Sequence, residues 1–347
     1  MDIQKAIDVL SRFGHLQQEE AEAVMNQIMT GGATQAQIGA YLMALRMKGE
    51  TQSEIVGSAR AMRDNAHRVP TTTAPDLLLD TCGTGGDKSG TFNISTTVAF
   101  VAAGAGLKIA KHGNRAASSK CGSADVLGEL GVNLDLTPEQ VGKCVDDVGI
   151  GFLFAAKLHP AMKNAIGPRR EIAVRTIFNI LGPLTNPAGA KRQLMGVFTA
   201  DLTPMLARVL ADLGTLSAMV VSGYGNMDEL TTTGPNTVSR LKDGSVTTYE
   251  FDPEDYGFRG AHISELLGDD ARTNAAILRG ILAGEITDAK RDVVVLNAGA
   301  ALMAGGLTDS LIDGIEMANA IINDGKALDK LDALVAYSQS LTQETVQ

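Results

Sequence analysis

The stretch that points to the fold covers residues 80–96 and reads DTCGTGGDKSGTFNIST. An apolar run at residues 77–79 precedes it, and small residues at helical spacing follow it from 97 to 106. This order predicts a strand, a glycine-rich turn and the start of a helix. Glycines let a backbone approach an anion closely, and free N–H groups at a helix start point towards it. The stretch therefore indicates a cradle for phosphate.

The stretch matches neither of two standard nucleotide-binding motifs. The G-x-G-x-x-G pattern that begins at Gly83 fails because Lys88 stands at the third glycine position, and the G-x-x-x-x-G-K-[ST] pattern fails because Asp87 precedes that lysine. A glycine-rich turn that binds nothing is therefore an alternative. The side chains of Asn93, Ser95 and Thr96 argue against it, because three hydrogen-bonding groups at a helix start exceed what one cap needs.

The composition is that of an ordinary globular protein with room for about two domains. Of 347 residues, 44% are hydrophobic, 20% charged and 4% aromatic. The net charge of −10 argues against non-specific binding to nucleic acid or to an anionic membrane. The three cysteines lack metal-binding spacing, the N-terminus has no signal-peptide character, and no apolar run approaches membrane-span length. These features favour a cytoplasmic protein.

Residues 1–70 predict a small helical domain. Apolar residues recur at helical spacing, and the pairs Thr34/Gln37 and Thr51/Glu54 match capping boxes. After a short linker, residues 76–347 alternate between strand and helix patterns, which predicts a large α/β domain with a central sheet covered by helices. Strands are expected at residues 107–110, 151–155 and 218–221, and helices at residues 123–130, 170–181 and 292–303.

A basic loop follows the strand expected at residues 107–110. Residues 111–120 read KHGNRAASSK and supply three cations, an imidazole and two adjacent hydroxyls. Cations neutralise phosphate charge and small donors bind its oxygens, so the loop suits a polyphosphate or a sugar phosphate. A solvated basic loop is the alternative, and a histidine such as His112 is by itself more often structural than catalytic.

Two charged groups later in the chain are further candidates. Asp228 and Glu229 lie in an expected loop, where adjacent carboxylates can reach one Mg²⁺ ion or two neighbouring ions. An acidic turn facing solvent is the alternative. Arg169 precedes the helix expected at residues 170–181, and an arginine at a helix start opposes the helix dipole. It therefore needs another role, such as binding a substrate carboxylate, or it serves surface solubility.

Taken in order, these segments resemble the anthranilate phosphoribosyltransferase family, glycosyltransferases of tryptophan biosynthesis. The matching pieces are residues 83–87 (GTGGD), 93–96 (NIST), 111–115 (KHGNR), 122–125 (GSAD), 159–162 (HPAM), 175–179 (RTIFN), 182–187 (GPLTNP) and 228–229 (DE). Lys88 departs from the glycine that is usual in the family, and this lysine either stiffens the loop or adds a phosphate contact.

The resemblance implies a fold shared with the pyrimidine nucleoside phosphorylases, in which helices near residues 165–185 join the small domain. It implies a homodimer and an enzyme that transfers the 5-phosphoribosyl group of phosphoribosyl pyrophosphate (PRPP) to the amine of anthranilate, with release of pyrophosphate. Two Mg²⁺ ions in each subunit are expected, and neither nucleic acid nor a membrane is an expected partner. Such a reaction needs leaving-group neutralisation and positioning more than a strong base.

The resemblance also implies three sets of binding residues, and it assigns none as an acid or base. PRPP is expected to contact Gly83, Gly86, Asp87, Thr91, Asn93, Ile94, Ser95, Thr96, Lys111, Asn114, Ser118, Ser119 and Ser123. Anthranilate is expected to contact Gly83, His112, Asn114 and Arg169. Mg²⁺ is expected to bind Ser95, Asp228 and Glu229.

Two alternative functions share this type of sequence. A pyrimidine nucleoside phosphorylase has the related fold, but its phosphate loop carries a Lys-His-Ser-Thr-Gly-Gly run that residues 80–86 lack. A non-catalytic relative that binds nucleic acid would show a basic surface and eroded substrate motifs. This chain is instead acidic and keeps Arg169, Asp228 and Glu229.

Overall fold

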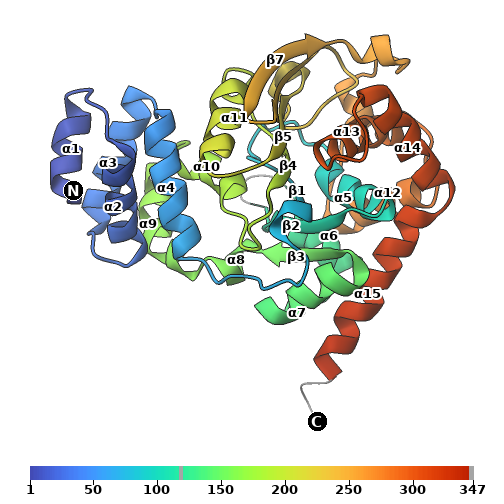
Figure 1. Ribbon diagram of the computed structural model, residues 1–347, viewed down its shortest axis with the longest axis horizontal. Helices are drawn as coiled ribbons and strands as arrows, with labels where there is room; N and C mark the ends of the chain where they lie inside the picture. The colour runs from blue at the N-terminus through green and yellow to red at the C-terminus, as the bar shows by residue number, and fades with distance from the viewer. Residues whose placement is uncertain (117–119, 344–347) are drawn as a thin grey trace.

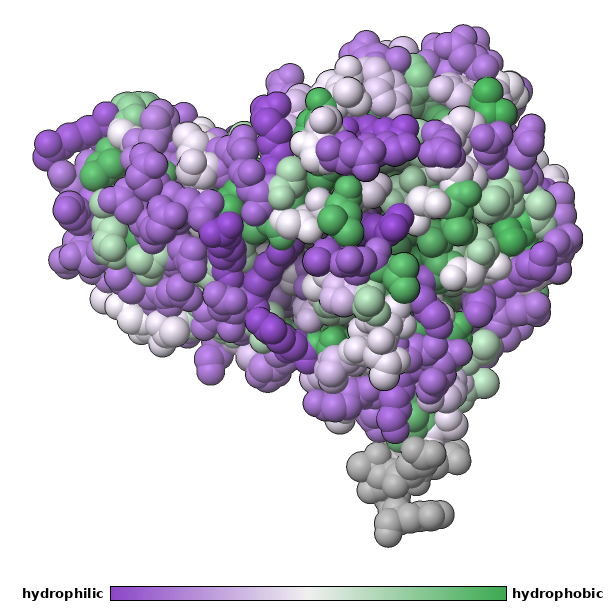
Figure 2. Space-filling model, in the orientation of Figure 1, coloured by the Kyte–Doolittle hydropathy of each residue, from purple (hydrophilic) through white to green (hydrophobic). Residues whose placement is uncertain are grey.

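The computed structural model describes residues 1–116 and 120–343. It consists of an N-terminal helical domain and a large α/β domain built on a mixed seven-stranded sheet, which confirms the expected fold class (Figure 1). The space-filling view shows a notch between the smaller helical lobe and the larger α/β lobe (Figure 2). No helix in the described ranges combines the length and apolar character needed to cross a membrane.

Local sequence signals begin and end the helices of the N-terminal domain. The helices are α1 (Ile3–Ser11), α2 (Gln18–Met29), α3 (Gln35–Lys48) and α4 (Gln52–Asp64). Both expected capping boxes are present: Thr34 exchanges hydrogen bonds with Gln37 at the start of α3, and Thr51 does so with Glu54 at α4. Two helices from the middle of the chain pack against this bundle, α9 (Lys163–Ile172) on α2 and α3, and α10 (Phe178–Leu181) on α4.

The sheet has the strand order β3-β2-β1-β4-β5-β6-β7. Neighbouring strands are parallel from β3 to β5, whereas β6 and β7 form an antiparallel hairpin at one edge. The strands are β1 (Leu78–Gly83), β2 (Lys108–Gly113), β3 (Ile150–Phe154), β4 (Arg192–Gly196), β5 (Ser217–Ser222), β6 (Asn236–Lys242) and β7 (Ser245–Phe251). The four expected strands, including the one predicted from the apolar run at residues 77–79, correspond to β1, β2, β3 and β5.

Successive strand residues enter cores on opposite faces of the sheet, because strand side chains alternate. On β1, Leu79 joins the larger core, whereas Leu78 packs with residues of α7 on the other face. The larger core is completed by α5, α6 and α12–α15, and α11 connects the opposite face to the core of the helical domain. The helices of the α/β domain are α5 (Ile94–Gly104), α6 (Ser123–Glu129), α7 (Pro138–Lys143), α8 (Ala155–Leu158), α11 (Leu202–Asp212), α12 (Ala271–Leu282), α13 (Ala289–Ala304), α14 (Leu311–Asn323) and α15 (Lys326–Gln343).

The strand order places a binding crevice at the carboxyl end of β1. From β1 the chain builds the sheet first towards β2 and β3, and later towards β4 and β5. At such a reversal the loops leave the sheet in opposite directions and open a crevice outside the carboxyl ends of the strands. The glycine-rich loop begins at Gly83, the last residue of β1.

Two expectations about secondary structure need correction. The helix expected at residues 170–181 is interrupted: α9 ends at Ile172, Ala173 adopts a left-handed φ of +54°, and α10 begins only at Phe178. A residue in this conformation ends a helix, so a continuous apolar pattern gave the wrong boundary. In addition, β4 and the β6–β7 hairpin were not expected, although Asp243-Gly244, with φ of +51° and +74°, is a strong turn signal.

Candidate active site

A polar cavity of about 590 Å³ opens where the glycine-rich loop, β2 and α5 meet. The glycine-rich loop forms one wall, and Lys111, Asn114 and Ser123 come from the region of β2 and α6. Residues 267–269 and Asn274 close another side. The strand–turn–helix expected at residues 77–106 therefore lies on the wall of a cavity, as a phosphate cradle requires.

Backbone N–H groups are available for an anion in this cavity. Within the described residues, the N–H groups of Gly86, Asp87 and Lys88 have no hydrogen-bond acceptor, and neither do those of Ser95 and Thr96 in the first turn of α5. A loop with positive φ at successive glycines and a helix start both present N–H groups to anions. The cavity thus offers two sets of neutral donors for phosphate oxygens.

Asn93 precedes α5 but does not cap it with its side chain. Its Oδ1 instead accepts a hydrogen bond of 3.0 Å from Nδ2 of Asn274 in α12. Asn93 and Ser95 are therefore used in tertiary contacts along the cavity wall, whereas Oγ1 of Thr96 is buried without a hydrogen-bond partner among the described residues.

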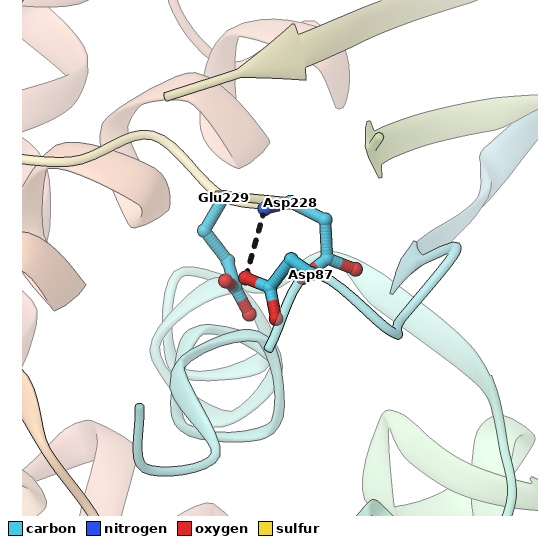
Figure 3. A group of neighbouring side chains, drawn as sticks. All are labelled: Asp87, Asp228 and Glu229. Atoms are coloured by element: carbon cyan, nitrogen blue, oxygen red, sulfur yellow. Dashed lines mark hydrogen bonds between the residues drawn. The ribbon is translucent and has the colours of Figure 1, made fainter. Parts of the chain in front are cut away.

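Three carboxylates converge at the edge of the polar cavity. Asp87 in the glycine-rich loop, and Asp228 and Glu229 in the loop after β5, each have a carboxylate oxygen within 4.8 Å of the others (Figure 3). The N–H of Asp228 donates to Oδ2 of Asp87 at 3.3 Å, and Oδ2 of Asp228 accepts from the N–H of Gly85 at 2.6 Å. The two loops are therefore held together, although more than a hundred residues separate them in the chain.

Burial makes the negative charge of this cluster unfavourable without a cation. It raises the pKa of Asp228 to about 7, with a further contribution from the charge of Asp87. The pKa of Glu229 is raised well above its usual range by burial and by the charges of Asp228 and Asp87. The Oε2 atom of Glu229 is buried without a hydrogen-bond partner among the described residues. Clustered carboxylate oxygens of this kind suit a hard divalent cation.

A buried network beneath the cavity fixes Lys111. Its ammonium donates to the carbonyl oxygen of Thr81 and lies 3.4 Å from Oγ of Ser95. Burial lowers the pKa of Lys111, and the charge of Asp80 opposes this shift. Asp80 in turn accepts from the N–H of His112 at 3.0 Å and from Nδ2 of Asn186 at 2.8 Å. The carboxylate thus holds β2 in place behind the cavity.

A second, apolar cavity of about 430 Å³ lies beside the first, between the helical domain and the sheet. Met62 of α4 and Ile166 of α9 line one side, and Ala155 and Pro183 line others. Cys82, Gly83, His112, Gly113 and Asn114 line both cavities. The two cavities therefore meet at the carboxyl ends of β1 and β2.

Arg169 is a half-buried cation without a carboxylate partner in the described part of the chain. Its guanidinium lies 5.1 Å from the ring centre of Phe178 and faces the apolar cavity. Burial lowers its pKa. The reason given for this arginine from the sequence was wrong, because Arg169 lies in the last turn of α9, where the helix dipole favours a cation. What marks the residue is its unpaired guanidinium beside an apolar space.

Two buried histidines line the same cavity as neutral rings. The rings of His112 and His159 lie 5.1 Å apart and are tilted by 47°. Burial lowers the pKa of His112 to about 3 and that of His159 to about 4. Each Nε2 atom is buried without a hydrogen-bond partner among the described residues. The rings are therefore uncharged at neutral pH.

The expected ligand-binding residues fall into these two cavities with few exceptions. The polar cavity is lined by Gly83, Gly86, Asp87, Thr91, Asn93, Ser95, Thr96, Lys111, Asn114 and Ser123. The apolar cavity is lined by Gly83, His112, Asn114 and Arg169. Ile94 lines neither, because its side chain is buried in the core and its N–H donates to the carbonyl of Phe92. Ser118 and Ser119 lie outside the described residues.

Two features of the site were not anticipated. Asp87 was expected to contact PRPP, but it also shares a metal-sized space with Asp228 and Glu229. Asn274 and residues 267–269 come from a part of the chain where the sequence showed no clear signal. Only the fold brings these segments to the cavity, so no local pattern could have identified them.

Comparisons with known proteins agree with this geometry. The helical bundle domain of a glycosyl transferase family matches residues 3–66, and the a/b domain of that family matches residues 76–328. The chain is 52% identical over 339 residues to the anthranilate phosphoribosyltransferase of Thermoanaerobacter sp. strain X514, covering 98% of this chain and 99% of that protein. It is 54% identical over 327 residues to that of Desulforamulus reducens, covering 94% of each.

Solved structures give the same result. The crystal structure of anthranilate phosphoribosyltransferase from Thermus thermophilus has a TM-score of 0.91 and 42% identity, covering 96% of this chain and 99% of that one. The Saccharomyces cerevisiae enzyme, solved in complex with PRPP and Mg, has a TM-score of 0.88 and 26% identity, covering 97% and 98%. With relatives this similar over nearly its whole length, the chain belongs to the anthranilate phosphoribosyltransferase family.

Proposed function

We propose that the two adjoining cavities carry out the reaction of this family. The chain is a pentosyltransferase of tryptophan biosynthesis, which transfers the 5-phosphoribosyl group of PRPP to the amine of anthranilate and releases pyrophosphate. The polar cavity receives PRPP and the apolar cavity receives anthranilate. The observation that carries this assignment is that the cavities meet at Gly83 and Asn114, so the sugar carbon and the amine can approach each other there.

In the polar cavity, binding and neutralisation of the diphosphate lower the barrier to breaking the bond between the sugar and pyrophosphate. The N–H groups of the glycine-rich loop and of the first turn of α5 that have no acceptor in the described residues donate to phosphate oxygens, and the ammonium of Lys111 adds positive charge. As the bond from the sugar to pyrophosphate breaks, negative charge grows on the leaving group. Donors fixed in advance stabilise that charge without reorganising.

The carboxylate cluster fits Mg²⁺, and the relative from S. cerevisiae was solved with PRPP and Mg. Asp228 and Glu229 would hold the ion or ions, with Asp87 beside them and the hydroxyl of Ser95 nearby. Mg²⁺ usually binds one or two carboxylates together with substrate phosphates, and it would neutralise charge on the diphosphate. The raised pKa values of Asp228 and Glu229 support a site that needs a cation. We propose two ions in each subunit.

In the apolar cavity, the side chains orient anthranilate rather than activate it. The guanidinium of Arg169 pairs with the carboxylate, and the apolar walls hold the ring with its amine towards Gly83. An aromatic amine is neutral at physiological pH and attacks without a base. The neutral rings of His112 and His159 fit this role, because they line the apolar cavity without adding charge. Attack then depends on positioning.

A fluorescence assay tests the function directly. Anthranilate fluorescence should fall when purified protein, PRPP and Mg²⁺ are combined, and it should remain constant when EDTA removes the metal. 4-Aminobenzoate is a matched acceptor whose carboxylate lies across the ring from the amine, so Arg169 cannot pair with it in the same pose. Absence of turnover by folded protein, or equal turnover with both acceptors, would contradict the assignment.

We further propose that residues 1–70, joined by helices near 165–185, form the small domain, and that residues 76–347 form the large one. The packing of α9 and α10 on the N-terminal helices supports this division. A homodimer formed through the small domain is supported by exposed Phe13 and Met47 on its surface. A cytoplasmic location is supported by the three cysteines, which form no disulfide within the described chain. Light scattering of the purified chain tests the dimer.

A further inference from the structure

We propose that Arg175 is a positioning residue that holds the glycine-rich loop in its phosphate-binding conformation. The proposal rests on the function proposed above, because it concerns how the polar cavity binds the diphosphate of PRPP. It assigns a role to a side chain that lines neither the polar nor the apolar cavity.

The contacts of Arg175 reach the loop from behind. The residue lies in the irregular segment between α9 and α10, and Nη2 of its guanidinium donates a hydrogen bond to the carbonyl oxygen of Gly86. The same guanidinium lies 4.0 Å from the ring centre of Phe198, which follows β4. No carboxylate in the described residues pairs with Arg175. A planar cation on an aromatic ring is held in one orientation, so its donor direction is fixed.

The hydrogen bond fixes the direction of a neighbouring N–H group. In a trans peptide the carbonyl of one residue and the N–H of the next point in opposite directions. Because Arg175 holds the carbonyl of Gly86 away from the polar cavity, the N–H of Asp87 is turned towards it. That N–H has no acceptor among the described residues. It is therefore available to a phosphate oxygen only while the peptide keeps this orientation.

The glycines make this restraint necessary. Gly85 and Gly86 have φ values of +66° and +74°, and a Cβ built on either would meet no atom of the described residues within 4 Å. Glycine changes readily between positive and negative φ, so the peptide between Gly86 and Asp87 can rotate unless another group holds it. The residue on the other side of this peptide is Asp87, and its carboxylate Oδ2 accepts a hydrogen bond from the N–H of Asp228. One hydrogen bond from Arg175 thus positions both a phosphate donor and a member of the carboxylate cluster.

The test compares Arg175→Gln, Arg175→Lys and Phe198→Leu with the wild type. Arg170→Gln is the matched control, because Arg170 is an exposed arginine in the last turn of α9. For Arg175→Gln we expect kcat/KM for PRPP to fall about 10- to 100-fold, as for loss of a charged hydrogen bond, while the KM for anthranilate changes less than about threefold. Arg175→Lys should recover part of this loss. The kcat/KM of Phe198→Leu for PRPP should lie between those of Arg175→Gln and Arg175→Lys.

Two binding measurements separate positioning from general damage. Calorimetry with Mg²⁺ and inorganic pyrophosphate should show weaker binding by Arg175→Gln, with a melting temperature close to that of the wild type. Amide hydrogen exchange should speed up at Gly85 and Ser89 in this variant, because their N–H groups are hydrogen-bonded to Asp228 and Asp87 while the loop keeps its conformation. Equal rises in the KM values of both substrates would overturn the proposal, and so would unchanged exchange in the loop. Wild-type protein without PRPP-dependent turnover contradicts the proposed function instead, and loop exchange still decides the role of Arg175.

Discussion

The polar and apolar cavities recognise their ligands by different physical means. The polar cavity relies on backbone N–H groups, Lys111 and three carboxylates suited to a cation, all placed around the glycine-rich loop. The apolar cavity relies on hydrophobic side chains from several helices and on the guanidinium of Arg169, which has no carboxylate partner in the described residues. A flexible polyanion needs many donors at set distances, whereas a flat aromatic acid needs a shaped space and one cation. Changes on one side should therefore leave the KM of the other substrate nearly unchanged.

The largest expected effect comes from removing charge in the carboxylate cluster. Asp228→Asn and Glu229→Gln should each lower kcat/KM for PRPP by at least about 100-fold, because even residues that only support metal ligands cost 10- to 100-fold. Asp255→Asn, at an exposed position, is the matched control. Steady-state kinetics over a range of Mg²⁺ concentrations measures the effect. Full activity of either variant at the Mg²⁺ concentration used for the wild type would show that the polar cavity does not depend on its carboxylate cluster.

Arg169→Gln tests the opposite side. The KM for anthranilate should rise by about 10- to 100-fold, because a charged hydrogen bond to the substrate carboxylate is lost, and the KM for PRPP should change little. Arg170→Gln serves as the neighbouring control, because it removes the same charge from a residue that does not line the apolar cavity. A larger rise in the KM for PRPP than in the KM for anthranilate would show that Arg169 does not act in the apolar cavity.

The apolar cavity should also make stability depend on pH through its histidines. A histidine with a folded pKa below the unfolded value contributes its full stability above about pH 6.5, and that contribution is lost as the pH falls towards the folded pKa. With a pKa of about 4 in the fold, His159 should lose about 2 kcal/mol between pH 7 and pH 5. Denaturant unfolding at both pH values should show a smaller loss for His159→Asn than for the wild type. An equal loss in both would show that this ring stays solvated.

The smallest expected effect concerns Lys88. Its φ of +64° is one that glycine adopts without strain, and its side chain lines the polar cavity. Lys88→Gly should raise the free energy of unfolding by about 1 kcal/mol. The KM for PRPP should rise roughly two- to fivefold, since an exposed cation contributes little to binding. Lys88→Asn keeps tolerance of positive φ without the charge, so it separates the two effects. Unchanged KM values would leave the lysine with a conformational role alone.

Local patterns predicted those parts of the site that lie close together in the chain. Capping pairs such as Thr51/Glu54 and the strand–turn–helix around Gly83 depend on hydrogen bonds and dihedral angles within a few residues. The helix expected at residues 170–181 failed because its apolar spacing continued through Ala173, whose left-handed conformation no pattern indicated. The reason first given for suspecting Arg169, its place at a helix start, failed with that boundary. Arg169 remains the candidate for the substrate carboxylate, but it lies at the end of a helix and not at the start of one.

The sequence by itself determined that this chain carries a glycine-rich loop, a basic loop, an acidic pair and the motifs of one enzyme family. Only the tertiary structure decided that Asp87 joins Asp228 and Glu229, that Arg175 holds Gly86, and that α9 supplies Arg169 to a cavity beside β1. The physical reason is the separation along the chain over which each kind of interaction acts. Propensities and caps act over a few residues, whereas these contacts depend on strand order and helix packing, which bring together groups up to more than a hundred residues apart.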